Sequence, residues 1–301
     1  MKKKPMRCAA IHDLSGLGKC SLTVALPVLS VCGVETSVLP TAVLSTHTGG
    51  FQDYVFVDLT RELLPIAEHW HRVGAAFEAV YTGFLGNARQ IALVDRILGD
   101  FRAQGSLAVV DPVMGDNGRL YPTYTEEMAA GVAALCQRAD VLIPNMTEAA
   151  RILGLPYRKG PYSADDIREI LRKLCRLGDP EGRRKRKTVL TGIDLGPGQL
   201  GVACRDEGSG RTAFFMEERV PGDFHGTGDF FASVLTGGLL NGMDLFQAAQ
   251  TATHATWRVI VSTAASASDL RFGPKFEEHL PWLGILMENY RKNLAKSADL
   301  G

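Results

Sequence analysis

The segment ARQIALVDRILGDFRAQGSLAVVD, residues 88–111, contains the unit on which the fold prediction depends. Its first part is amphipathic and predicts a helix over 88–104. It continues into Leu107-Ala-Val-Val110, an almost continuous apolar run that is typical of a parallel strand buried on both faces. A helix followed directly by such a strand indicates an α/β fold.

The same alternation extends through most of the chain. It predicts parallel strands at 7–11, 35–43, 79–82, 107–111, 141–143 and 188–190. Helices are expected at 19–32, 61–74, 88–104, 125–138, 147–153, 163–177, 229–240, 245–262 and 276–295. Two strands at 200–205 and 212–217, joined by a polar turn, predict an antiparallel hairpin at one sheet edge. We therefore expect one domain over residues 1–301, with a doubly wound, mostly parallel sheet and helices on both faces.

Composition excludes several classes of function. The 301 residues include 33 basic and 33 acidic side chains, so the net charge is zero and argues against binding nucleic acid through the overall field. The basic run at 183–187 is expected to be a solvated loop. The six cysteines are scattered, as in a reduced cytosolic protein, and the first apolar stretch, 8–11, is too short for a signal peptide or a membrane span. We expect a cytoplasmic protein that binds neither nucleic acid nor membrane.

Candidate site residues end or follow the predicted strands at their carboxyl ends, where open α/β sheets bind ligands. They are Asp13, His47, Gly83, Phe84, Asp111, Asn145 and Thr191. We expect these residues to gather along one edge of the sheet.

The strongest motif is His225-Gly-Thr-Gly-Asp229, at the start of a predicted helix. Glycines allow a tight turn with bare backbone N–H groups, and the amino end of a helix suits a phosphate. The carboxylate of Asp229 could accept a proton from a substrate hydroxyl beside that anion. Local sequence alone equally allows a glycine-rich turn followed by an ordinary acidic residue of a helix start.

Two further motifs are Val110-Asp-Pro-Val-Met-Gly-Asp116 and Ile143-Pro-Asn-Met-Thr-Glu148. An aspartate before proline can be only part of a turn. Asn145 and Glu148 suit a Mg²⁺ ion held largely through water, but they could equally cap the following helix.

In their order along the chain, the motifs resemble those of the ribokinase superfamily, and most closely its pyridoxal (vitamin B6) kinases. The resemblance extends from about residue 7 to about residue 265. The G-T-G-D segment resembles the signature in which glycines form an anion hole and the aspartate is the catalytic base. The resemblance implies that Gly226, Thr227 and Gly228 form this hole and that Asp229 deprotonates the acceptor hydroxyl.

The resemblance also implies a nucleotide site for ATP. Its residues would be Asp111, Tyr121, Asn145, Glu148 and Thr191, with Asp111 and Glu148 holding Mg²⁺ through water. Residues 117–124 would form a mobile loop that closes over the nucleotide. A homodimer is expected, and a role for a monovalent cation stays open.

On the acceptor side, Ser45-Thr-His-Thr-Gly49 resembles the S-N-H-T segment that lines the vitamin pocket of pyridoxal kinases. It implies that His47 and Thr48 contact the substrate, with Phe84 facing them; a polar loop with an exposed histidine is the alternative. Asp13 lies in His12-Asp-Leu-Ser-Gly-Leu-Gly18, which resembles the D-x-S-G-G-A-G loop of hydroxymethylpyrimidine kinases. Asp13 is expected to contact the substrate ring or its hydroxyl group.

The expected reaction is ATP-dependent phosphorylation of the hydroxymethyl group of pyridoxal, pyridoxine or pyridoxamine. A hydroxymethylpyrimidine (phosphate) kinase is the alternative of the same class. A sugar kinase is disfavoured because the sequence predicts no separate lid of strands near the amino terminus. A catalytically silent ligand-binding protein on the same scaffold is a further alternative, against which the intact Asp229 motif argues.

Overall fold

Nine strands form one mixed sheet in the computed structural model, which describes residues 6–266 and 269–299. The strand order is β11-β10-β9-β8-β5-β4-β1-β2-β3. Its parallel part consists of β1 (Met6–Leu17), β2 (Val34–Thr46), β4 (Ala79–Thr82), β5 (Leu107–Val110), β8 (Val141–Leu142) and β9 (Lys187–Ile193). The predicted α/β architecture with a mostly parallel sheet is confirmed.

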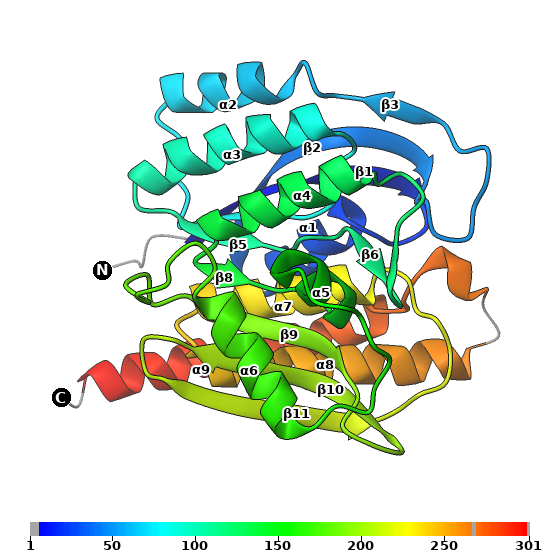
Figure 1. Cartoon of the computed structure of the whole chain (residues 1–301). Coiled ribbons are helices and arrows are strands. Elements are labelled where there is room, and N and C mark those ends of the chain that lie inside the picture. The colour runs from blue at the N-terminus through cyan, green and yellow to red at the C-terminus, as the bar shows by residue number, and fades with distance from the viewer. Residues whose placement is uncertain (1–5, 267–268, 300–301) are drawn as a thin grey trace.

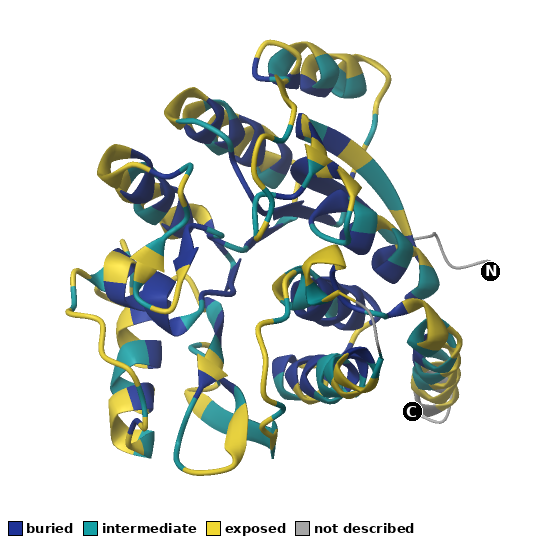
Figure 2. Cartoon of the chain, turned by 90° about the vertical axis from the view of Figure 1, so that its right-hand side faces the viewer, coloured by how far each residue is buried: buried dark blue, intermediate teal, exposed yellow. Residues whose placement is uncertain are grey.

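Helices cover both faces of the sheet (Figure 1). One face packs against α2 (Leu63–Arg72), α3 (Ala88–Ala103), α4 (Glu126–Leu135), α5 (Met146–Leu153) and α6 (Ala164–Cys175). The other packs against α1 (Leu22–Val31), α7 (Thr227–Leu240), α8 (Leu245–Ala265) and α9 (Leu280–Asp299). Because side chains alternate along a strand, Ala9 and Ile11 of β1 enter the first core and Cys8 enters the second. Buried residues accordingly gather between the sheet and the two helical layers (Figure 2).

Both edges of the sheet are antiparallel. The predicted hairpin is present as β10 (Gln199–Asp206) and β11 (Arg211–Glu218). At the opposite edge, β3 (Phe56–Asp58) pairs antiparallel with β2, and β1 and β2 remain paired as far as Leu17 and Thr46. β3 belongs to the main sheet and was not among the predicted strands, because its three residues are all exposed and too few to show a periodic pattern.

A two-stranded hairpin, formed by β6 (Gly115–Asp116) and β7 (Arg119–Leu120), overlaps the amino-terminal half of the predicted mobile loop at 117–124. The turn residues Asn117 and Gly118 have φ angles of 50° and 80°. Two successive positive φ angles are the pattern of a type I′ turn, for which Asn-Gly is the typical sequence. The sequence therefore carried a hairpin signal that the prediction of a plain loop missed.

Several helices begin where the sequence supplies a capping side chain. Asn87 caps α3, Thr125 caps α4, and Ser163 with Asp166 forms the predicted capping box of α6. Helix α1 begins at Leu22, three residues later than predicted, because Gly18 and Ser21 have φ angles of 87° and 54° that interrupt helical geometry.

The basic run at 183–187 is solvated only in part. Arg183 is exposed, as predicted, but the Arg186 side chain is fully buried against backbone carbonyl groups. The prediction failed there because a guanidinium group can be satisfied by carbonyl oxygens without any acidic partner. Within the described ranges, no helix is both long enough and apolar enough to cross a membrane.

Candidate active site

The amino end of α7 is open to an anion. No side chain caps this helix, and the hydroxyl of Thr227 instead donates to the carbonyl oxygen of Phe224 at 2.8 Å. The N-cap residue Gly226 has a φ of 78°, and a Cβ atom there would overlap the carbonyl oxygen of Lys19. Gly228 has open space where a side chain would project. The backbone N–H groups of the first turn and the positive end of the helix dipole therefore lie beside open space at the exposed Gly228.

Asp229 lies in the first turn of α7, beside these glycines. Its Oδ2 atom accepts a hydrogen bond of 2.8 Å from the backbone N–H of Ser21, at the start of α1. Burial raises the pKa of Asp229 to about 7, the charge of Asp13 raises it further, and the Ser21 N–H opposes the change. A carboxyl group with a pKa near neutrality is well matched to accepting a proton.

Asp13 lies in β1, where the pairing with β2 shifts register between His12 and Leu14. The bulge redirects the strand at this point. Asp13 is buried, its Oδ2 accepts a hydrogen bond of 2.9 Å from the hydroxyl of Ser15, and burial raises its pKa. Leu14, the next residue, forms a backbone bridge with Ser21, whose N–H binds Asp229, so Asp13 and Asp229 belong to one site, and the charge of Asp13 raises the pKa of Asp229.

Asp111 and Glu148 add two more carboxyl groups. The pKa of Asp111 lies well above its usual range because of burial and then because of the negative charges of Glu148 and Asp229. Glu148 is buried and accepts backbone hydrogen bonds from Met114 at 3.0 Å and Asn145 at 2.8 Å. Burial raises the pKa of Glu148 to about 7.

Asn145 and Glu148 form a capping box at the start of α5. The side-chain Oδ1 of Asn145 accepts the backbone N–H groups of Thr147 and Glu148, and its Nδ2 donates to the backbone carbonyl oxygen of Gly115 at 2.8 Å. Asn145 also forms a backbone bridge with Thr191. The bond to Gly115 fixes the base of the β6–β7 hairpin beside the carboxyl cluster.

Tyr121 follows this hairpin, and its backbone N–H donates to the carbonyl oxygen of Met114 at 3.0 Å. Its pKa is raised by burial and then by the charges of Glu148, Asp116 and Asp111. Tyr121 therefore lies within the electrostatic reach of the same cluster.

The carboxyl groups fit a magnesium ion that is held mainly through water and phosphate oxygens. Carboxyl groups that raise one another's pKa are stabilised by a nearby cation. Both oxygens of Glu148 already accept backbone N–H groups, so this residue suits an indirect contact. Over the described ranges, no group of three or more His, Cys, Asp or Glu residues is placed to hold a metal by itself.

The acceptor-side residues differ in their surroundings. His47 is buried rather than exposed, and both of its ring nitrogens have protein partners. Thr48 is half-buried. Phe84 belongs to the hydrophobic core and packs edge-on against Tyr124, with 5.9 Å between the ring centroids.

Sequence reasoning missed Cys20 and Ser21. The pKa of Cys20 is raised by burial and then by the charges of Asp229 and Asp13, which places this thiol beside the two carboxyl groups. Ser21 contributes the backbone N–H that binds Asp229. The sequence carries no side-chain signal for such a backbone contact, which joins residues 208 positions apart.

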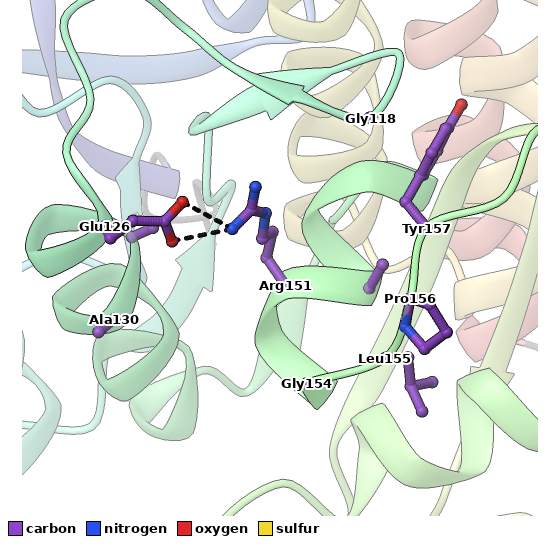
Figure 3. Close-up of a pocket in the computed structure, with 10 residues that line it drawn as sticks. Gly118, Glu126, Ala130, Arg151, Gly154, Leu155, Pro156 and Tyr157 are labelled. Carbon is purple, nitrogen blue, oxygen red and sulfur yellow. Dashed lines mark hydrogen bonds and ion pairs between the residues drawn. The ribbon is translucent and has the colours of Figure 1, made fainter.

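A surface hollow of about 480 Å³ lies between α4, α5 and residues 154–157 (Figure 3). Glu126 and Arg151 form an ion pair of 2.8 Å across it, and Gly118 of the hairpin turn lines one side. Of the predicted nucleotide loop at 117–124, Gly118 lines this hollow, whereas Asp229 and the other predicted catalytic and binding residues do not.

Comparison with known proteins identifies the family. The phosphomethylpyrimidine kinase family model matches residues 26–273, which is most of the chain. A Saccharomyces cerevisiae protein named "Putative pyridoxal kinase BUD17" is 30% identical over 221 residues, which are 69% of this chain and 66% of the yeast protein. The chain thus spans slightly less than two thirds of that relative.

Solved structures agree with this assignment. A Bacteroides thetaiotaomicron protein, called a "putative phosphomethylpyrimidine kinase" and crystallised with pyridoxal, is 37% identical, with a TM-score of 0.86 and coverage of 93% of this chain and 96% of that one. The pyridoxal kinase of Lactobacillus plantarum is 32% identical, with a TM-score of 0.82 and coverage of 95% and 99%. The chain belongs to the phosphomethylpyrimidine kinase family of the ribokinase superfamily.

Proposed function

We propose that this protein transfers the γ-phosphoryl group of ATP to the hydroxymethyl group of a B6 vitamer. The observation that carries the proposal is the position of Asp229, a carboxyl group with a pKa of about 7, beside the uncapped amino end of α7. Phosphoryl transfer depends on positioning and on charge stabilisation, and this arrangement offers a base and an anion site within one helical turn.

In the proposed step, the substrate hydroxyl oxygen forms a bond to the γ-phosphorus while the bond to the ADP oxygen breaks. The hydroxyl proton passes to the carboxylate of Asp229. The backbone of Gly226, Thr227 and Gly228 stabilises the negative charge of the group in transfer. Gly226 suits this role because its conformation and its contact with Lys19 exclude a side chain.

The nucleotide would lie along the carboxyl ends of the strands, beside Asp111, Asn145, Glu148, Thr191 and Tyr121. Asp111 and Glu148 would hold Mg²⁺ through water, and the ion, when bound, screens the phosphate charges. The β6–β7 hairpin would close over the phosphates. Its base is already fixed to the site by the bond from Asn145 to Gly115.

Two relatives support a B6 vitamer as the acceptor: the Bacteroides protein crystallised with pyridoxal and the Lactobacillus pyridoxal kinase. Asp13, Thr48 and Phe84 would line the acceptor pocket. Hydroxymethylpyrimidine is the second candidate acceptor, and the carboxyl group of Asp13 in the β1 bulge favours it. This residue resembles the aspartate of hydroxymethylpyrimidine kinases, and the matching family model carries the phosphomethylpyrimidine kinase name.

A steady-state assay with six acceptors tests the proposal: pyridoxal, pyridoxine, pyridoxamine, hydroxymethylpyrimidine, ribose and fructose. We expect a higher kcat/KM for the three vitamers than for hydroxymethylpyrimidine, and negligible turnover of the sugars, which need many more hydrogen-bond partners than this pocket offers. A preference of about tenfold or more for hydroxymethylpyrimidine would replace the B6 proposal with the second candidate. No ATP turnover with any acceptor would favour a silent binding protein.

A further inference from the structure

His47 is held by two hydrogen bonds inside the protein. Its Nδ1 atom accepts the backbone N–H of Gly49 at 3.1 Å, and its Nε2 atom lies 2.5 Å from the backbone carbonyl oxygen of Arg271. Because Nδ1 faces a donor and Nε2 faces an acceptor, the ring must be the neutral tautomer that carries its proton on Nε2. Burial, opposed by the bond to Arg271, lowers the pKa of His47 and keeps it neutral.

The faces of the His47 ring are also occupied. A Cβ atom on Gly18, whose φ is 87°, would lie 2.6 Å from Cδ2 of His47. Phe51 packs edge-on against the ring at 5.0 Å between centroids, and His225 lies at 5.5 Å. A ligand in the pocket would therefore meet no polar atom of His47 that lacks a partner.

The turn whose backbone carbonyl group binds His47 lies in the carboxyl-terminal part of the sequence. Arg271 belongs to the short 3₁₀ helix Leu270–Phe272, and its guanidinium group lies 5.5 Å from the ring centroid of Phe51. The ring of Phe272 packs edge-on against Phe51, also at 5.5 Å. His47 and Phe51, at the two ends of residues 47–51, are thus both attached to this turn.

The same turn holds the loop that follows β1. The carbonyl oxygen of Phe272 accepts the backbone N–H of Lys19 at 3.1 Å. A side chain on Gly273 would clash with Lys19, and one on Gly226 would clash with the carbonyl oxygen of Lys19. Residues 270–273 therefore contact both residues 47–51 and the loop after β1, and Lys19 of that loop lies against Gly226.

We propose that His47 is a positioning residue that fixes the acceptor-side wall, residues 48–51, through its Nε2–H bond to the carbonyl group of Arg271. The role rests on the proposed function, and it replaces the direct substrate contact that sequence resemblance implies. Without the bond, each binding event must order residues 48–51, and the conformational entropy lost in that ordering weakens acceptor binding. The cost falls on acceptor binding, because Asp229 and the amino end of α7 are held by other contacts.

Two substitutions of His47 can each preserve one of its two hydrogen bonds. In His47→Gln, the amide nitrogen can occupy the place of Nε2 and donate to Arg271, whereas in His47→Asn the amide oxygen can replace only Nδ1 as acceptor for Gly49. We expect His47→Asn to raise the KM for the acceptor about tenfold, with kcat and the KM for ATP changed by less than about threefold. His47→Gln should recover most of the lost affinity.

Equal loss in both variants, or recovery by Asn instead of Gln, would overturn the proposal in favour of direct contact with the substrate. A fall in kcat with an unchanged KM would overturn it as well, because it would place His47 in the chemical step. Amide exchange at 48–51 should be faster in His47→Asn than in His47→Gln.

The bond itself is tested in the wild-type protein without any activity. Long-range ¹H–¹⁵N correlation of the seven histidine rings, with His47 assigned by its absence in His47→Gln, should show a neutral Nε2–H tautomer at pH 7. A protonated ring or the other tautomer would overturn the inference. If the wild type phosphorylates no tested acceptor but shows this tautomer and exchange pattern, then the proposed function fails while the tie between His47 and Arg271 stands.

Discussion

Asp229 and Asp13 are neighbouring carboxyl groups in unlike surroundings. Asp229 receives one backbone N–H, from Ser21, and projects from the positive end of a helix, whereas Asp13 is buried within a strand bulge beside the hydroxyl of Ser15. Environments of this kind assign different chemical tasks to identical groups. The proposal gives proton acceptance to Asp229 and substrate orientation to Asp13.

The first prediction concerns Asp229→Asn. The amide keeps the shape of the side chain but cannot accept the proton, so kcat should fall by about 10²–10⁴-fold while binding of an ATP analogue persists. Steady-state kinetics and analogue titration provide the measurements. Asp223→Asn, at an exposed position of the preceding loop, is the matched control. Wild-type turnover in Asp229→Asn would mean that Asp229 is not the catalytic base.

The second prediction is a pH profile. Because burial raises the pKa of Asp229 to about 7, kcat/KM for the acceptor should rise with pH through about 7 and level off above it, where the carboxylate is ionised. The charge of Asp13 contributes to that raised value. Asp13→Asn should therefore shift the acidic limb to lower pH, in addition to any change in acceptor affinity. An acidic limb that does not move would assign the titration to another group.

Among the structural elements, the β6–β7 hairpin has the geometry expected of a nucleotide lid. Gly118 donates its backbone N–H to the hydroxyl of Thr147 at 2.9 Å, and it lies against the ring of Tyr157. The turn therefore rests on α5, which also carries Glu148. Movement of this turn would be transmitted directly to the carboxyl cluster.

The third prediction tests this element with Gly118→Ala. A Cβ atom there would lie 2.5 Å from Cδ1 of Tyr157, at a φ of 80° that disfavours alanine, so the turn must shift. We expect the KM for ATP to rise several-fold, with a smaller change in the KM for the acceptor. Gly210→Ala is the control, because its φ is 71° but no atom would lie within 4 Å of the new Cβ. Equal effects of the two variants on the KM for ATP would contradict a lid role for the hairpin.

The elements also show what could be predicted from sequence and what could not. Long amphipathic helices and buried strands such as Leu107–Val110 were predicted because their burial imposes a period on the sequence. β3 has only three residues, all exposed, so no such period exists. In the site, the motif residues Asp229, Asp111 and Glu148 were predicted, and the structure brings them together. The contact between His47 and Arg271 was not predicted, because it joins a side chain to a backbone carbonyl 224 residues away.

At the scale of the whole molecule, one buried arginine joins three elements. The guanidinium group of Arg186 donates to the carbonyl oxygens of Ala139 and Gln137, after α4, and to those of Leu174 and Leu177, at the end of α6. Arg186 itself directly precedes β9. A cation suits this place because the carboxyl ends of helices carry partial negative charge. Burial lowers the pKa of Arg186, but its carbonyl partners replace the lost water.

The fourth prediction follows from this arrangement. Arg186→Met fills a similar volume but leaves several buried carbonyl groups without a donor, so the free energy of unfolding should fall by about 2–4 kcal/mol. Arg183→Met, in the same basic run, removes only an exposed side chain paired with Glu181. It should change the free energy of unfolding by less than about 0.5 kcal/mol. Urea unfolding at pH 7 measures both variants. Because α4 and α6 pack on one face of the sheet and α7, which carries Asp229, packs on the other, the KM values of folded Arg186→Met should stay close to those of the wild type. Equal urea midpoints of unfolding for Arg186→Met and Arg183→Met would mean that water satisfies these carbonyl groups. The basic run would then be solvated throughout, as the sequence alone predicts.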